Sequence, residues 1–404
     1  MKRDLIDETV KRYLAKQDLA CAALIVRKND TVVYKNKWGY QDIRSRKPLE
    51  YDSIFRMMSM TKCVTAVGVM ILVEEGKLSL DDPLGKFLPI FADMKVVDDK
   101  RYVFKNNPRT LEAIMKMLFF RIDTVKTTTV DRVVTIRDLL SHASGIEQGW
   151  VGYLQTLKDK KTYESLAKKV ERYALYPLDF QPGTATGYSP LAGFDILARV
   201  IEVVVGTDAG TYFHERIFRP LGMDSTTFFL DQSQSERLVR LYKKKRNRLI
   251  DMTNTKEDIE GIIRTGGKCI SGSGGLYSTL GDFENFARML ANDGQFNGKT
   301  FLHKSTVDLI HTEAQINHLE VEPGSVWGLG VIIRHDPLRS GSHVTGGTYG
   351  WSGAFGTHFF ISPEDRLDAV WVTNRSDSGG SSSPVSKKIE ELVFKLFTDK
   401  RQEG

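Results

Sequence analysis

Strand-like segments occur near both ends of this 404-residue chain, and helical patterns fill most of the stretch between them. Near the N-terminus, the apolar runs 22–27 and 31–34 are separated by Lys28-Asn29-Asp30, which predicts a β-hairpin. Further strand-like runs follow in the C-terminal half, at 226–230, 238–242, 327–334, 355–361 and 367–373. We therefore expect an α+β fold: one antiparallel β-sheet, formed by both chain ends and flanked by helices, with an inserted, mostly helical domain.

Helical periodicity is found mainly in the central part of the chain, and the predicted helices span 4–16, 59–75, 136–141, 163–173, 192–205, 209–218, 280–292 and 385–397. A chain of this length exceeds the size at which a single hydrophobic core usually stops growing. The expected division is a sheet domain of residues 1–58 and 226–404 and a helical domain of residues 59–225. We expect the active site in the cleft between them.

The composition is that of an ordinary soluble enzyme, with 41% hydrophobic residues, 27% charged residues and a net charge of +6. The basic run 243–248 has the pattern of a solvated hairpin tip, so we expect no nucleic-acid partner. Cys21, Cys63 and Cys269 form neither a C-x-x-C pair nor a metal-binding spacing, and no metal or cofactor is predicted. Because a signal peptide and an 18-residue apolar stretch are missing from the sequence, we expect a cytoplasmic protein without a membrane partner. The oligomeric state is not predicted.

Ser59 and Lys62 stand at the start of the 59–75 segment, which is apolar nearly all round and therefore predicts a buried helix. Their spacing places a hydroxyl and an amine on one helical face. A serine is a weak nucleophile until a base takes its proton, and a lysine serves as that base when its pKa falls below about 10.4. The alternative is a helix N-cap serine. The same spacing recurs at Ser165 and Lys168, in a charged segment where we expect both side chains to be exposed.

Two further stretches support catalysis at Ser59. Residues 181–190 form a turn that delivers Tyr188, whose hydroxyl is able to relay a proton, just before a predicted helix. Residues 346–357 are a glycine-rich strand edge that allows a ligand to approach closely, and a backbone N–H there would complete an oxyanion hole. His142 is a candidate for a triad base, but its position at a helix end favours a structural role. The G-x-S-x-G elbow of α/β-hydrolases is absent from the sequence.

The order and context of these three stretches resemble the serine β-lactamase and penicillin-binding-protein-like superfamily, and most of all the family VIII carboxylesterases and class C β-lactamases. Segments 135–146, 217–223 and 274–279 add to the resemblance, which covers about residues 20 to 375. It implies that Ser59 is the acylated nucleophile, that Lys62 is its general base and that Tyr188 shuttles protons. It also implies an oxyanion hole formed by the backbone N–H groups of Ser59 and Ala354.

The chain departs from the lactamase pattern at two positions. Lactamases and D,D-peptidases usually have Tyr-x-Asn, but Pro190 takes the third position here. They also carry a cation on the third-motif strand, where this chain has Trp351-Ser352-Gly353. The loss of an amide and a cation disfavours an anionic peptide-like substrate, and the tryptophan supplies an apolar wall. Trp150 is a further candidate for lining the cleft, with surface packing as the alternative.

The sequence therefore predicts a serine carboxylesterase that hydrolyses small carboxylic esters through an acyl-enzyme on Ser59. Other functions that use the same acyl-enzyme are a β-lactamase, a D-aminopeptidase or D,D-peptidase, and an acyltransferase. A third class is a catalytically silent binding protein. Cleft loops such as 95–130 and 147–160 are expected to determine which ester is accepted.

Overall fold

The computed structural model describes residues 4–102, 121–158, 165–255, 258, 269–312, 314, 319–380 and 383–398. Its main sheet contains β1 (Cys21–Lys28), β2 (Thr31–Asp42), β3 (Lys47–Pro48), β12 (Glu320–Glu322), β13 (Ser325–Trp327), β14 (Ile332–Arg334), β15 (Thr348–Ser352), β16 (His358–Ser362) and β17 (Leu367–Val372).

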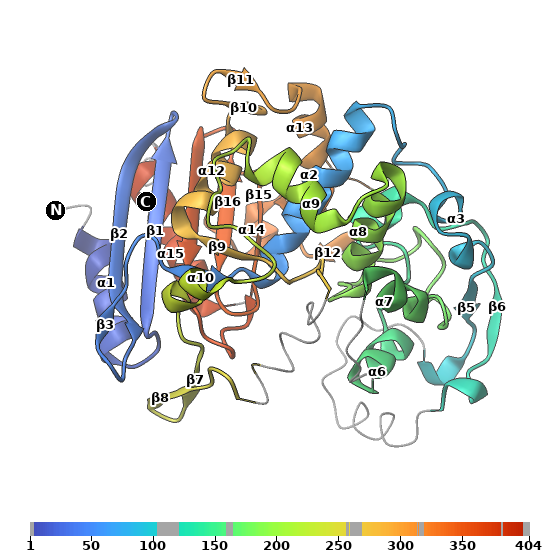
Figure 1. Ribbon diagram of the computed structural model, residues 1–404, viewed down its shortest axis with the longest axis horizontal. Helices are drawn as coiled ribbons and strands as arrows, with labels where there is room; N and C mark the ends of the chain where they lie inside the picture. Colours follow the sequence, from blue (N-terminus) through green and yellow to red (C-terminus); the bar gives the residue numbers. More distant parts are fainter. Residues whose placement is uncertain are drawn as a thin grey trace.

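These nine strands are antiparallel and follow the order β12-β13-β14-β15-β16-β17-β1-β2-β3 (Figure 1). The two chain ends meet where β1 pairs with β17, with Ile25 opposite Val370. The predicted fold class, an antiparallel sheet formed by both chain ends, is confirmed. The predicted β1–β2 hairpin is also confirmed: Asn29 and Asp30 form its two-residue loop with φ angles of 51° and 57°, as a type I′ turn requires.

Helices cover both faces of the sheet. On the outer face, α1 (Asp4–Ala15) and α15 (Pro384–Phe397) pack over Trp371 and Phe360. The inner face carries α12 (Leu280–Ala291), which packs against Phe359 and Val370. Because side chains alternate along a strand, neighbouring residues such as Phe359 and Phe360 enter different cores. This alternation also decides which third-motif side chains face the nucleophile.

The central helices form one packed group on the inner side of the sheet (Figure 1). Its members are α2 (Thr61–Glu74), α5 (Ile136–Leu140), α7 (Leu166–Tyr173), α8 (Ala192–Val205) and α9 (Ala209–Phe213), and α8 contacts each of the others. Further helices are α3 (Leu84–Phe87), α6 (Trp150–Lys158), α10 (Gln232–Arg237), α13 (Lys304–Ile310) and α14 (Pro337–Ser340). Among the described helices, none has both the length and the apolar character needed to cross a membrane. The division into domains 1–58 with 226–404 and 59–225 stays a prediction.

Several predicted strands differ from the observed ones. The run 327–334 is a hairpin of β13 and β14, because Gly330 turns the chain with a φ of 80°. The predicted strand 226–230 is reduced to one bridge, between Thr227 and Tyr277, and 238–242 contributes only a bridge at Leu238 and the first residue of a later strand. The end of the predicted helix 209–218 is a π-helical turn, His214–Phe218.

Short elements that the periodicity does not predict complete the structure. Asp231 caps α10 in a capping box with Gln234, which explains a helix between two expected strands. Within the described residues, four small two-stranded sheets pair β4 (Ile54–Arg56) with β9 (Tyr277–Thr279), β5 (Lys95–Val97) with β6 (Thr127–Thr129), β7 (Tyr242–Lys245) with β8 (Arg248–Asp251), and β10 (Gln295–Phe296) with β11 (Lys299–Thr300). Of the loops expected to shape the cleft, residues 103–120 and 159–160 lie outside the described residues.

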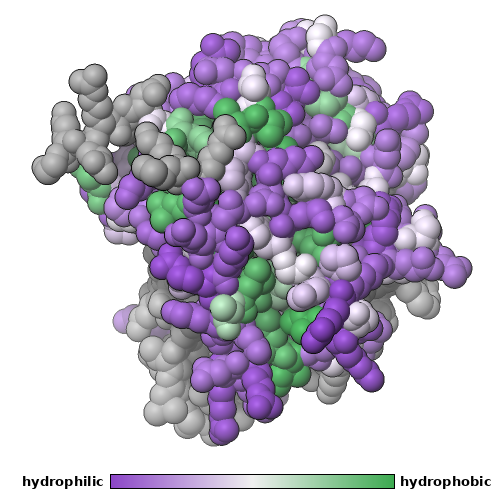
Figure 2. Space-filling view, turned by 90° about the vertical axis from the view of Figure 1, so that its left-hand side faces the viewer, coloured by the Kyte–Doolittle hydropathy of each residue, from purple (hydrophilic) through white to green (hydrophobic). Residues whose placement is uncertain are grey.

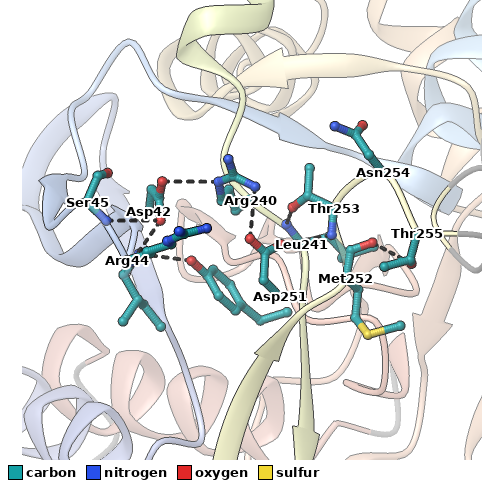
Figure 3. A network of polar contacts seen from close by, with 12 residues as sticks. Asp42, Arg44, Ser45, Arg240, Leu241, Asp251, Met252, Thr253, Asn254 and Thr255 are labelled. Atoms are coloured by element: carbon teal, nitrogen blue, oxygen red, sulfur yellow. Dashed lines mark hydrogen bonds and ion pairs between the residues drawn. The ribbon is translucent and has the colours of Figure 1, made fainter.

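The basic run forms the β7–β8 hairpin, as predicted. Arg240 anchors its base through Asp42, at 3.1 Å, and Asp251, at 2.8 Å (Figure 3). The hydroxyl of Tyr242 also accepts a hydrogen bond from the Ile43 N–H at 2.9 Å. Figure 2 shows that the face carrying α1 and β2 is largely hydrophilic, with smaller hydrophobic areas between the polar groups.

Candidate active site

Ser59 lies in a short 3-10 turn, Met58–Met60, that leads directly into α2. The preceding Met58 has a φ of 51°, a conformation that non-glycine residues seldom adopt and that is common near functional sites. The N-caps of the turn and of α2 are Met57 and Met60, and neither makes a side-chain capping bond. The alternative that Ser59 is an N-cap serine is therefore wrong.

Two side chains converge on the Ser59 hydroxyl. The Tyr188 hydroxyl donates to Ser59 Oγ at 2.6 Å, and Lys62 Nζ lies 3.4 Å from the same oxygen. Lys62 is 1% exposed, and Nζ also donates to the carbonyl oxygens of Pro190, at 2.7 Å, and Ser273, at 2.8 Å. Three oxygen atoms therefore lie within reach of the Lys62 amine and orient it. The structure thus brings together Ser59, Lys62 and Tyr188, as the sequence predicts.

Buried polar groups hold the loop that presents Tyr188. His142 Nδ1 accepts a hydrogen bond from the Ser189 N–H at 3.1 Å, and its carbonyl accepts one from the Gly187 N–H at 3.2 Å. Glu147 Oε2 accepts from the backbone N–H of Leu191, at 2.9 Å, and of Ala192, at 2.6 Å, where α8 begins. The residues on both sides of Tyr188 are therefore fixed from a different part of the chain.

His142 has a structural role in this arrangement. Its ring packs against the rings of Tyr188, Trp327 and Phe194, with centroid distances of 4.9, 4.3 and 5.3 Å. Burial is the main reason that the pKa of His142 is well below its usual value, and the charge of Lys62 acts in the same direction. A neutral imidazole that accepts from a backbone N–H supports the Tyr188 loop, in agreement with the structural interpretation of His142.

The third predicted stretch approaches Ser59 through the end of β15. The Trp351 ring lies 5.3 Å from the Tyr188 ring and 4.7 Å from the Trp327 ring, which makes an aromatic wall beside the nucleophile. Gly353 follows the strand, and a Cβ built there would lie 2.3 Å from the Met57 carbonyl oxygen. A glycine is thus required for β15 to approach the Ser59 turn. In the described part of the chain, the Ala354 N–H donates to no protein acceptor.

Ser352 faces the other side of the sheet from Trp351. Its Oγ lies 2.7 Å from His358 Nδ1 on β16, and His358 Nε2 lies 3.1 Å from Glu390 Oε2 on α15. All three line a cavity of about 270 Å³ between the outer sheet face and α15. The Ser352 hydroxyl therefore lies on the sheet face opposite to the one that carries Trp351, and a substrate contact at Ser352 stays a prediction.

Trp150, the remaining predicted contact residue, lies at the start of α6. It is buried, and among the described residues it packs in a small cluster with Tyr102, Val151 and Leu154. A contact between Trp150 and substrate stays a prediction. The second Ser-x-x-Lys match is a surface feature: Ser165 caps α7, and Lys168 forms an exposed ion pair with Glu171 at 2.8 Å.

Comparison with known proteins places the chain in a family. The Beta-lactamase family matches residues 6–392, which is nearly the whole sequence. The chain belongs to the Beta-lactamase family. Its members and structural neighbours include serine hydrolases with esterase and peptidase names.

Two relatives of this Beta-lactamase family chain are similar over most of their length. Protein Rv1367c of Mycobacterium tuberculosis (strain ATCC 25618 / H37Rv) is 28% identical over 374 residues, which cover 88% of this chain and 85% of that protein. Esterase EstB of Burkholderia gladioli is 24% identical over 415 residues, which cover 96% and 94%. The structure of EstCE1, described as a hydrolase with promiscuous acyltransferase activity, matches with a TM-score of 0.77, 21% identity and coverage of 96% and 97%. That likeness shows a shared fold.

Three contributors to the site were missed in the sequence. Trp327 lies in what was predicted to be a single strand, so nothing indicated that it would meet Trp351. Ser273 acts through its backbone carbonyl, which carries no residue-type signal. Glu147 has a φ of 55° in the loop after α5. No local sequence pattern reveals that its carboxylate caps the distant helix α8.

Proposed function

We propose that this chain is a serine carboxylesterase that hydrolyses small carboxylic esters through an acyl-enzyme on Ser59. The observation that carries this proposal is the convergence of two proton-handling groups on one hydroxyl, with Tyr188 at 2.6 Å and Lys62 at 3.4 Å from Ser59 Oγ. A nucleophile within hydrogen-bond reach of an oriented base is the arrangement that nucleophilic catalysis needs.

The reaction proceeds in two halves. Ser59 Oγ bonds to the ester carbonyl carbon while its proton passes to the Lys62 amine, directly or through the Tyr188 hydroxyl, and the ester C–O bond then breaks as the leaving oxygen takes that proton and departs as an alcohol. Water then attacks the acyl-enzyme and gives a proton to the same pair, and the Oγ–acyl bond breaks as Ser59 Oγ regains that proton and the acid is released. Tyr188 is the nearer proton partner, and Lys62 Nζ lies 5.1 Å from the centre of the Tyr188 ring. The N–H groups of Ser59 and Ala354 are the proposed oxyanion hole.

The walls of the site favour an ester over an anionic peptide. Trp351 and Trp327 form an aromatic wall next to Tyr188, and Trp351 stands at the strand position where the resemblance places a cation in lactamases. Pro190 offers Lys62 a carbonyl oxygen and has no side-chain amide to bind a substrate amide. An apolar acyl or alkoxy group of a substrate would bind favourably against these aromatic side chains. A substrate carboxylate would have no opposite charge on Trp351, Trp327 or Pro190 to pair with.

A burst assay tests the proposal. With p-nitrophenyl esters of short acids, the parent protein is expected to release one equivalent of p-nitrophenol rapidly and to gain the mass of the acyl group. Ser59→Ala is expected to lose both signals. Ser165→Ala is the matched control, because it removes the other Ser-x-x-Lys serine and costs only a surface cap of about 1 kcal/mol. A parent without burst or acyl adduct would instead support the catalytically silent class.

Acyl transfer is the second candidate, because the structural neighbour EstCE1 is described as a hydrolase with promiscuous acyltransferase activity. Water and an alcohol attack the same acyl-enzyme, so the two functions differ in the acceptor. Rising concentrations of a small alcohol are expected to leave the burst unchanged. Ester formation exceeding acid formation at low alcohol concentration would favour the transferase, and β-lactam hydrolysis in the same mass assay would favour the lactamase.

A further inference from the structure

Lys62 is oriented by backbone carbonyls, with no carboxylate partner among the described residues. Its amine donates to Pro190 and Ser273 carbonyl oxygens, and both distances are shorter than the one to Ser59. A carboxylate in contact with a lysine favours the ammonium form and so opposes proton transfer from the nucleophile. Carbonyl groups orient the amine without adding a full negative charge. The positions of the Pro190 and Ser273 carbonyls together therefore set where the amine lies.

The Ser273 carbonyl belongs to a turn that Asp195, on α8, holds in place. Asp195 Oδ1 accepts from the Ser271 hydroxyl at 2.7 Å and from the Ser273 N–H at 3.2 Å. A third bond to the turn comes from α2, where the Thr65 hydroxyl donates to the Gly272 carbonyl at 2.8 Å. A side chain on α8 thus fixes the residue whose carbonyl contacts Lys62.

The charge of Asp195 is compensated on the side away from the turn. Lys169, on α7, lies 2.6 Å from Asp195 Oδ2, and the Tyr173 hydroxyl donates to the same oxygen at 3.1 Å. Both members of the ion pair are almost completely buried, at 4% and 0% exposure of their side chains. A buried carboxylate without its counter-ion would be costly and would act on Lys62 as an uncompensated negative charge.

We propose that Asp195 is a positioning residue for the reaction at Ser59. With Lys169 as its counter-ion, it fixes the Ser271–Ser273 turn so that the Ser273 carbonyl aims the Lys62 amine at the nucleophile. This inference rests on the acyl-enzyme chemistry proposed above. Asp195 Oδ1, which faces the turn, is the atom that positions it. The ion pair with Lys169 compensates the charge of the buried Asp195 carboxylate.

Two double variants of equal charge separate positioning from charge. Asp195→Asn with Lys169→Met keeps an oxygen for Ser271 and Ser273 and turns the amide N–H toward the Tyr173 oxygen. Asp195→Ala with Lys169→Met removes that oxygen. The measurement is the pre-steady-state acylation rate and the substrate binding constant with a p-nitrophenyl ester, together with thermal unfolding. Arg27→Met with Glu284→Gln is the control, since it removes another largely buried ion pair, between β1 and α12.

The asparagine pair is expected to acylate within about threefold of the parent rate. The alanine pair is expected to acylate about 100-fold more slowly with an unchanged binding constant, the loss typical of a misplaced reacting group. The control is expected to unfold at a lower temperature and to acylate normally. If the alanine pair does not fold, Ser271→Ala, which keeps the ion pair, is expected to slow acylation about tenfold by loosening the same turn.

Equal acylation rates for the two folded Asp195 double variants would overturn the inference. Where Ser271→Ala is tested instead, acylation at the rate of the parent protein would also overturn the inference. A parent protein that forms no acyl-enzyme would refute the proposed function instead, so the two failures are distinguishable.

Discussion

Gly353→Ala is expected to slow acylation of Ser59 while the fold persists. A Cβ at Gly353 would lie 2.3 Å from the Met57 carbonyl oxygen, and ordinary van der Waals contact begins at 3.4 Å, so the two backbones would have to separate by 3.4 − 2.3 = 1.1 Å. The Thr357 hydroxyl, 2.1 Å from the same Cβ, would also have to move. Met57 precedes Ser59 by two residues, and a displacement of about 1 Å in an active site costs roughly 100-fold in rate, or about 2.7 kcal/mol.

The assay is kcat/KM for a p-nitrophenyl ester, with thermal unfolding measured in parallel. Overpacking is expected to lower the free energy of unfolding by about 1–3 kcal/mol. Gly281→Ala is the matched control, because this glycine lies in α12 and a Cβ there would have no atom within 4 Å. It is expected to keep full activity and to stabilise the helix by up to about 1 kcal/mol. A kcat/KM for Gly353→Ala equal to that of the control would refute the close-approach reasoning.

Two other substitutions test the proton partner and a buried carboxyl group. Tyr188→Phe keeps the ring in the aromatic wall but removes the bond to Ser59, so the burst rate is expected to fall about 10²- to 10⁴-fold with little change in unfolding temperature; an unchanged burst would exclude Tyr188 from proton transfer. Burial, with the charge of Glu284 adding to it, raises the pKa of Asp368 from 3.8 to about 8, so the native state binds more protons than the unfolded chain between these pH values. Asp368 is therefore expected to lower the parent's free energy of unfolding as the pH rises from about 4 to 8, by up to about 4 kcal/mol by pH 7, and Asp368→Asn is expected to remove this contribution in urea titrations at several pH values. Parallel pH dependence in both proteins would contradict the assignment.

The elements that sequence periodicity predicts well are those in which one pattern persists. The helix predicted at 192–205 is α8 with the same bounds, because its apolar face is continuous and Gly206 ends it with a φ of 74°. The prediction of one strand at 327–334 is wrong because the run is apolar on both sides of the turn at Gly330, so the sequence pattern shows no break there. β4 and β9 have three residues each, too few for any period to appear.

The site residues also fall into those that a local sequence pattern predicts and those that it does not. Ser59, Lys62 and Tyr188 act through side chains at characteristic spacings, so motifs identified them, and the structure brings them together. Ser273 contributes a carbonyl that every residue possesses, and Asp195 looks like any polar residue on a helix until α8 is placed against the turn. Such contributions depend on the packing of distant segments. A single sequence carries no local record of them.

The position of the nucleophile is a property of the junction between sheet and helices. Met58 adopts a strained φ beside Ser59, and such strain persists only when surrounding groups overdetermine the backbone. Three bonds from separate segments do so: the Thr61 hydroxyl donates to the Met58 carbonyl at 2.6 Å, the Thr357 hydroxyl to the Met57 carbonyl at 3.1 Å, and the Met57 N–H to the Leu276 carbonyl at 2.9 Å. Because the last two come from the segments that also supply the Gly353 contact and the Ser273 carbonyl, the turn that carries Ser59 and the carbonyl that orients Lys62 are held by the same part of the chain. A shift of the Leu276 segment would therefore move the Ser59 turn and the Ser273 carbonyl together, whereas Tyr188 is held separately through His142 and Glu147.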